Sequence, residues 1–177
     1  MLRSIFIYGT IAGLIAGGAL SAVTLGAHAQ SEIVGLLIGY TTMLIALSAV
    51  FVAIKRRRDK ELGGVIKFWP ALGLGLGISA VAGIFYAAAW DLALWITHMD
   101  FAGNYAKAMI AAEKAKGVSG AELRKVADQW NAWAASYANP LYRWTETFTE
   151  IFPVGVLVSL VSAGLLRNSR FLPARKQ

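Results

Sequence analysis

The sequence predicts an all-α membrane protein with four transmembrane helices, both termini in the cytoplasm and an extracytoplasmic helical hairpin between spans three and four. Three observations support this prediction: composition, apolar runs and the distribution of charge. Of its 177 residues, 57% are hydrophobic and 15% are charged, whereas soluble domains carry about 25% charged residues. Four apolar runs, at residues 5–25, 33–54, 68–90 and about 148–166, reach the roughly 20 residues that a spanning helix needs.

The basic residues predict the orientation, because cytoplasmic segments of membrane proteins are enriched in Lys and Arg. One side of the four runs holds 11 of the 17 basic residues but only two of the 10 acids, Asp59 and Glu61. The 11 are Arg3, Lys55, Arg56, Arg57, Arg58, Lys60, Lys67, Arg167, Arg170, Arg175 and Lys176. This side is therefore predicted to be cytoplasmic. The net charge of +7 follows from this topology, and no nucleic-acid partner is expected.

The first run has some features of a secretory signal peptide. Arg3 precedes it, and Ala27, His28 and Ala29 resemble a small-residue cleavage site. The apolar core of a signal peptide is usually about 7–15 residues long, and residues 5–25 exceed this length. We therefore expect the first helix to be retained, and its removal would leave the other spans unchanged.

The second run begins after Ser31 and Glu32, which fit the acidic cap of a helix start, and ends in a basic segment. This segment is predicted to stop transfer through the membrane. Contact with anionic lipid is compatible with that role and would contribute about 1 kcal/mol per basic residue. The residues predicted to make it are Lys55, Arg56, Arg57 and Arg58.

Small residues recur at helical spacing in all four runs, which favours close packing between helices in lipid. We expect packing within one chain, with homodimerisation through one of these faces as the alternative. The residues are Gly9, Gly13 and Gly17, then Gly35 and Gly39, then Gly73, Gly77, Ala80 and Ala87, and last Gly155, Ser159 and Ala163. Glycines 73–77 superficially match a nucleotide loop, but no strand precedes them, so that match is rejected.

The connection over residues 98–139 predicts the helical hairpin. Its first helix covers residues 100–116 and ends at Gly117, and Ser119 with Glu122 matches a capping box that starts the second helix. Apolar residues recur every three or four positions along both helices, as in a packed pair. They are Phe101, Tyr105, Met109 and Ala112, then Leu123, Val126, Trp130, Trp133 and Tyr137. The tryptophans are expected to pack inside the hairpin or, alternatively, to lie at the membrane interface.

The fourth run carries two acids four residues apart, Glu146 and Glu150, followed by Pro153. Counting from its inner end at about 1.5 Å per residue, Glu146 is interfacial and is expected to pair with Arg143. Glu150 lies about 6 Å inside the hydrocarbon, where a charge costs a few kcal/mol unless it is paired, hydrated or protonated. Both acids lie opposite the small residues, so this span is predicted to be central in the bundle or shared with a second subunit.

Glu150, Asp91 and Glu146 form the candidate site, a buried polar cluster or an ion or proton site, with Glu32 and His98 as secondary candidates. Oxygen-rich clusters of this kind suit hard cations or proton relays. For Glu150, a structural hydrogen bond, a cation or proton site, and contact with a ligand all remain open. Cysteine is absent and no catalytic or metal-binding spacing is found, so no catalytic residue, metal or cofactor is predicted.

Several short motifs occur together along the chain. They are Glu32-Ile33-Val34-Gly35 with Gly39-Tyr40, Ala53-Ile54-Lys55, Arg58-Asp59-Lys60, Gly63-Gly64-Val65-Ile66 with Phe68, and Thr149-Glu150-Ile151-Phe152-Pro153-Val154-Gly155 with Ser159-Leu160 and Ser162-Ala163. This combination resembles a bacterial family of small four-span inner-membrane proteins that is catalogued only as a domain of unknown function. The resemblance covers nearly the whole chain and is weakest in the hairpin. It implies four spans in a bacterial inner membrane and supplies no activity.

Two functions of different classes are therefore carried forward. The first is a non-enzymatic scaffold or regulatory protein that binds partners through its hairpin and spans. The second is a small cation- or proton-coupled transporter or channel that uses Glu150 and Asp91; it would favour a dimer, because four short spans leave little room for a water path. An intramembrane enzyme is the third and least favoured class. The expected partners are the lipid bilayer, a second copy of the chain and an extracytoplasmic protein.

Overall fold

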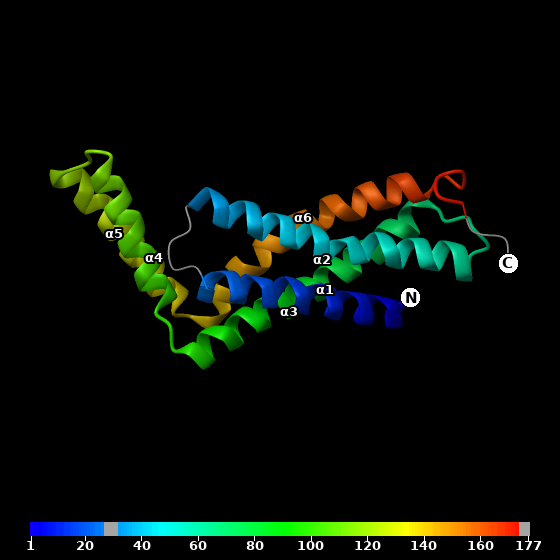
Figure 1. The fold of residues 1–177 in the computed structure, drawn as a ribbon, viewed down its shortest axis with the longest axis horizontal. Helices are drawn as coiled ribbons and strands as arrows, with labels where there is room; N and C mark the ends of the chain where they lie inside the picture. Colours follow the sequence, from blue (N-terminus) through cyan, green and yellow to red (C-terminus); the bar gives the residue numbers. More distant parts are fainter. Residues whose placement is uncertain (27–31, 174–177) are drawn as a thin grey trace. The chain divides into compact units, whose positions relative to one another are not determined.

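A computed structural model describes residues 1–26 and 32–173 of the chain, with side chains described for residues 1–23 and 34–173. These residues form six helices joined by short loops (Figure 1). The helices are α1 (Leu2–Gly26), α2 (Glu32–Glu61), α3 (Phe68–Thr97), α4 (Phe101–Ala115), α5 (Gly120–Tyr137) and α6 (Pro140–Leu166). Four of them, α1, α2, α3 and α6, are long and apolar enough to cross a membrane. The predicted all-helical class is confirmed, and these four helices coincide with the four predicted spans.

The spanning helices are longer than the apolar runs that predicted them. α2 continues through the basic segment to Glu61, and α6 begins at Pro140, eight positions before the apolar run at residue 148. Proline is favoured in the first turn of a helix, where its missing amide costs no hydrogen bond. Polar residues at the ends of a span thus extend the helix without extending its apolar part.

The chain divides into two compact units. Unit 1 comprises Met1–Trp90 and Thr147–Gln177 and contains α1, α2 and most of α3 and α6. Unit 2 comprises Asp91–Glu146 and contains the end of α3, the helices α4 and α5, and the start of α6.

In unit 1, α1 packs against α3 through its glycines. A Cβ atom added at Gly13 would lie 2.5 Å from the carbonyl oxygen of Ala82, and one added at Gly17 would lie 2.5 Å from Cβ of Ala89. These distances leave no space for a side chain, so the two backbones approach as closely as small residues allow. The glycines of the first span therefore pack within the chain, as predicted. A Cβ at Gly35 or Gly39 would meet nothing within 4 Å, so these α2 glycines make no such contact.

The helices α3 and α6 cross through a reciprocal pair of glycines and serines. A Cβ at Gly75 would lie 2.7 Å from Oγ of Ser159, and a Cβ at Gly155 would lie 2.5 Å from Cβ of Ser79. The two serine hydroxyls are buried, 3.3 Å apart, and each donates to the carbonyl four residues earlier in its own helix. The polar atoms at this contact are therefore satisfied inside the bundle.

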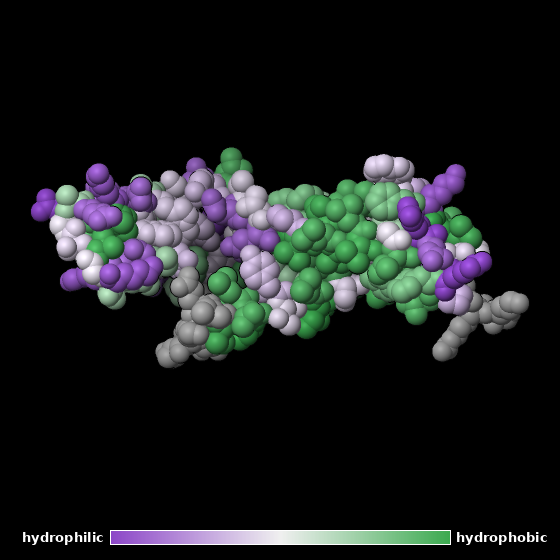
Figure 2. Space-filling view, turned by 90° about the horizontal axis from the view of Figure 1, so that it is seen from above, coloured by the Kyte–Doolittle hydropathy of each residue, from purple (hydrophilic) through white to green (hydrophobic). Residues whose placement is uncertain are grey.

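Large apolar side chains cover the outside of the bundle helices, where Figure 2 shows a broad hydrophobic surface. Examples more than half exposed are Phe6, Leu14, Leu37, Ile45 and Leu157. Soluble monomers rarely expose contiguous apolar surface of this kind. The surface is the one that spanning helices present to lipid.

In unit 2, α4 and α5 form the predicted hairpin around a cluster of aromatic rings. Ring centroids lie 5.7 Å apart for Tyr105 and Trp130, 5.6 Å for Tyr105 and Trp133, and 5.0 Å for Trp133 and Tyr137. These spacings are typical of favourable aromatic pairs. The tryptophans therefore pack inside the hairpin, as the first of the two expectations stated.

The two hairpin helices begin differently. Asp100 caps α4, with its Oδ1 accepting a hydrogen bond from the amide of Gly103 at 2.9 Å. The predicted capping box at α5 is wrong, because the side chain of Ser119 makes no cap hydrogen bond. Gly120, the next residue, has a φ of +61°; this left-handed conformation turns the first residue of α5 away from the geometry that a serine cap requires.

Candidate functional site

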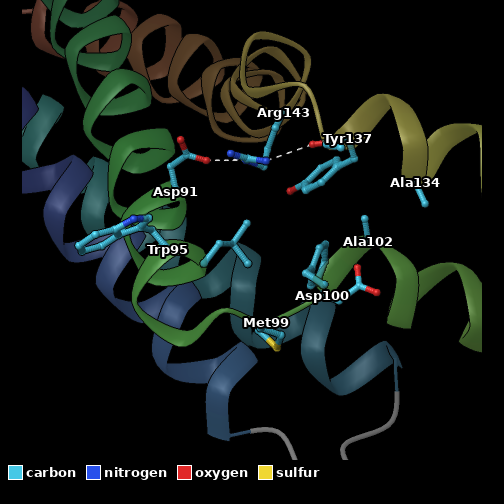
Figure 3. A pocket seen from close by; sticks show the side chains of 11 residues that line it. Asp91, Trp95, Met99, Asp100, Ala102, Ala134, Tyr137 and Arg143 are labelled. Atoms are coloured by element: carbon cyan, nitrogen blue, oxygen red, sulfur yellow. Dashed lines mark hydrogen bonds and ion pairs between the residues drawn. The ribbon is translucent and has the colours of Figure 1, made fainter.

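Asp91, near the end of α3, is held by two side chains from the start of α6. Arg143 donates from Nε to Oδ1 of Asp91 at 2.5 Å, and Trp144 donates from Nε1 to Oδ2 at 3.0 Å. Arg143 also donates from Nη1 to the carbonyl of Tyr137 at 3.1 Å, and its guanidinium lies 5.9 Å from that ring (Figure 3). One arginine thus joins the end of α3, the end of α5 and the start of α6. We call Asp91, Arg143, Trp144 and Tyr137 the Asp91 cluster.

The Asp91–Arg143 pair is expected to stabilise unit 2 measurably. Its side chains are 27% and 18% exposed, so solvent screens the pair only in part. In a double-mutant cycle with Asp91→Asn and Arg143→Gln, we expect a coupling energy of about 1–2 kcal/mol. Unfolding of the protein in mild detergent measures it.

The matched control is the pair of Glu113 on α4 and Lys116 at its C-cap, whose side chains are 28% and 67% exposed. Exposed ion pairs are typically worth about 0.2–1 kcal/mol. A coupling for Asp91 and Arg143 no larger than that of this control would contradict the structural role.

Glu150 lies in the middle of α6 and accepts a hydrogen bond from the hydroxyl of Tyr86 at 3.1 Å. The tyrosine is 1% exposed, within the core of unit 1, whereas Glu150 lies on the exposed face of its helix with Pro153. The opposite face, with Gly155 and Ser159, is buried. The prediction that this span is central in the bundle is therefore wrong. The alternative, a shared face with a second subunit, stays a prediction.

The remaining predicted site residues fall in different places. Glu146 is exposed near the start of α6 and hydrogen-bonds the side chain of Tyr142. His98 is exposed between α3 and α4 with a φ of +52°, a conformation in which histidine is enriched relative to most residues. The side chain of Glu32 and the whole of His28 lie outside the described residues.

Convergence of the candidate site residues into one cluster is not established. Asp91, Glu146 and His98 belong to unit 2, whereas Glu150 belongs to unit 1, so their convergence stays a prediction. Among residues with described side chains, no group of three or more His, Cys, Asp or Glu could hold a metal ion. The partners found instead, Arg143 and Tyr86, were not predicted. Arg143 was recognisable as the basic residue nearest the outer ends of the last two spans, but its partner was not.

The basic segment of α2 contains one residue that differs from the others. Arg58 is completely buried and donates to the carbonyl of Phe171 at 2.9 Å, to those of Leu166 and Leu172, and to Asp59 at 2.7 Å. The last carbonyls of a helix have no partner within it, and Arg58 supplies one at the end of α6. Sequence reasoning missed this role, and the resemblance of the Arg58-Asp59-Lys60 motif was the only signal.

The other basic residues of this segment lie nearer the surface. Lys55 pairs with Asp59, Arg56 contacts the hydroxyl of Tyr8 at 3.4 Å, and Nε of Arg57 lies 3.9 Å from Glu61. Lipid contact for the segment stays a prediction. For Arg58, the protein itself provides acceptors for the guanidinium.

Unit 2 also contains a cavity of about 360 Å³ (Figure 3). It lies between the end of α3, the start of α4, the end of α5 and Arg143. Its lining residues are Asp91, Leu94, Trp95, Met99, Asp100, Phe101, Ala102, Ala134, Tyr137, Ala138 and Arg143. Because these residues are distant in sequence, no motif could have indicated the cavity.

Residues 9–168 match the model of a family described as "Protein of unknown function (DUF4199)". No curated protein and no solved structure matches the chain. The match covers α2, α3, the hairpin and α6 in full, and α1 from residue 9 onward.

Proposed function

Because this chain belongs to the DUF4199 family, whose function is unknown, we propose its function from its own contacts: a non-enzymatic multi-pass membrane protein that binds a partner through unit 2. The Asp91 cluster is the observation that carries this proposal. Both oxygens of Asp91 accept hydrogen bonds from side chains that position the hairpin helices. Because both of its oxygens accept hydrogen bonds within unit 2, Asp91 is proposed to have a structural role and to hold the base of the hairpin in place.

The composition of the hairpin surface supports a role in binding a partner protein. The aromatic rings of the hairpin pack against one another between α4 and α5, while charged and polar residues face outward. Exposed examples are Lys107, Arg124, Lys125, Asp128 and Gln129. A surface on preformed helices binds a partner with little ordering cost.

The proposed topology places this surface outside a bacterial inner membrane, with both termini in the cytoplasm. The distribution of basic residues supports it, as does the start of α1 at the same end of the bundle as the end of α6 (Figure 1). Since the chain has no cysteine, a single introduced cysteine is the only thiol in the protein. Its labelling shows on which side of the membrane that residue lies. We expect Ser119→Cys to react with an impermeant maleimide in intact cells, and Ser169→Cys to react only after permeabilisation. The reverse pattern would contradict the topology.

Site-specific photo-crosslinking tests the partner. Ala108, Ala111 and Ala115 are exposed on one face of α4, so photoreactive residues there disturb little packing. In native membranes we expect the same discrete protein adduct from these positions, and none from Leu44, an exposed apolar residue of α2. Adducts absent at all three hairpin positions, or equally strong at Leu44, would contradict a partner specific to unit 2.

A cation- or proton-coupled transporter or channel is the second candidate. One observation favours it: Glu150 lies within a spanning helix and contacts Tyr86, whose hydroxyl can both donate and accept protons. Ionisable groups within membrane spans often mark ion or proton paths. This candidate predicts ion flux that depends on the protein, whereas the first candidate predicts none.

A further inference from the structure

The cavity in unit 2 combines apolar walls with both signs of charge. Leu94, Trp95, Met99 and Phe101 supply apolar and aromatic surface, and Asp91, Asp100 and Arg143 supply the charges. Ligand sites in proteins are typically about 300–1,000 Å³ and mostly apolar with a few polar groups. At about 360 Å³, the cavity is large enough for a small polar headgroup.

The two carboxylates of the lining are not equivalent. Asp91 is engaged by Arg143 and Trp144. Asp100 uses Oδ1 to cap α4, and a carboxylate offers roughly four acceptor sites, so it retains capacity for a further donor. Figure 3 shows Asp100 on the side of the cavity away from Asp91 and Arg143. The lining therefore presents an acid on one side and an arginine on the other.

This arrangement of charge suits a zwitterion. An ammonium group is stabilised by a carboxylate and by nearby aromatic faces, which Asp100 and Phe101 provide. Phosphate is favoured by a guanidinium, and Arg143 provides one, with its Nε and Nη1 already donating to Asp91 and to the carbonyl of Tyr137. With both Asp91 and Asp100 in the lining, an anionic ligand without an ammonium group would be disfavoured.

The surroundings of the cavity suit a ligand that carries acyl chains. The cavity lies at the end of α3, a helix long and apolar enough to span a membrane. Leu92, Trp95 and Ile96 of that helix are 54%, 72% and 61% exposed, and indole rings favour the headgroup level of a bilayer. Apolar chains leaving the cavity would find apolar surface there.

We propose that this cavity binds the headgroup of a zwitterionic phospholipid, with its ammonium group at Asp100 and its phosphate at Arg143. The site is distinct from the protein-binding surface proposed above and stands without it. Bound lipid would fill the space between the end of α3, the start of α4 and the end of α5, and so stabilise the base of the hairpin.

Native mass spectrometry of the full chain in mild detergent tests the proposal. Phosphatidylethanolamine and phosphatidylglycerol with identical acyl chains are titrated separately, so that only the headgroup differs. We expect the ethanolamine lipid to bind about tenfold more tightly, as one charge-assisted contact allows. Equal binding of the two lipids would indicate a non-specific lipid shell and would overturn the proposal.

Two variants and a control distinguish a specific loss of lipid binding from a general effect of substitution on the fold. Asp100→Asn keeps the helix cap, since asparagine caps as well as aspartate, but removes the charge; it should abolish the preference for the ethanolamine lipid. Ala134→Phe fills the cavity and should weaken binding of that lipid by a similar factor. Asp128→Asn, on the exposed face of α5, should change nothing. A preference that survives both cavity variants would overturn the proposal.

A soluble headgroup distinguishes a lipid from a free metabolite. Phosphoethanolamine carries the same ammonium and phosphate groups without acyl chains. If the site is a lipid site, an equimolar amount should fail to displace the bound ethanolamine lipid. Complete displacement at equimolar concentration would assign the cavity to a free solute and overturn the lipid proposal.

Discussion

Replacing Gly13 with leucine is expected to separate α1 from α3 and to lower the free energy of unfolding by about 3 kcal/mol, the upper end of overpacking costs. A Cβ at this position would lie 2.5 Å from the carbonyl oxygen of Ala82 and 2.6 Å from Cβ of Phe85. Backbone atoms cannot rotate away as a flexible side chain can. The clash therefore requires one helix to move relative to the other, which loses contacts along the whole interface.

The control is on the same helix. A Cβ at Gly18 would meet nothing within 4 Å, so Gly18→Leu changes hydrophobicity and helix propensity by the same amount without a clash. Thermal unfolding in mild detergent, followed by circular dichroism, compares the two variants. Equal stability of Gly13→Leu and Gly18→Leu would contradict the packing of α1 on α3.

Replacing Arg58 with methionine is expected to destabilise the protein by about 3–5 kcal/mol, the usual cost of removing one partner from a buried charged network. The change leaves the carbonyls of Leu166, Phe171 and Leu172 without this donor. It also removes one of the two basic partners of Asp59. Methionine fills much of the volume of the arginine side chain, so the loss of stability comes from the missing hydrogen bonds and charge.

Arg56→Met is the matched control, because Arg56 is exposed and makes a single long contact to Tyr8. It should cost less than about 0.5 kcal/mol, as surface changes usually do. Arg58→Lys should restore only part of the loss, since one ammonium group cannot reproduce the planar fork of a guanidinium. Comparable destabilisation by the Arg56 and Arg58 substitutions would contradict the capping role.

Much of the fold could be predicted from the sequence, because lipid imposes a simple rule. Backbone groups in a bilayer must be satisfied within each span, so long apolar runs identify helices. The helix ends were less predictable, since α2 and α6 continue into polar residues that carry no apolar signal. The capping box at Ser119 failed for a local reason, the left-handed Gly120, which the residue types alone did not reveal.

The candidate site was less predictable. Asp91 and Glu150 could be singled out, because an acid in or near a span needs a partner. Their partners, Arg143 and Tyr86, lie 52 and 64 positions away in the sequence, and no periodicity indicates contacts over such distances. The burial of Arg58 was likewise hidden, because the residues immediately before it in sequence are also basic and the residue types do not distinguish it from them. Residue types identified which groups required partners, but only the packing of the helices identified the partners.

We propose that the acids of the spans hold the structure and do not carry ions. Proton and cation flux in proteoliposomes tests this claim most directly, with wild type, Glu150→Gln and empty vesicles compared under an imposed gradient. We expect all three to show the same background flux, with both proteins folded by circular dichroism. A flux with wild type that exceeds the empty vesicles and is lost in Glu150→Gln would contradict the claim and establish a transporter.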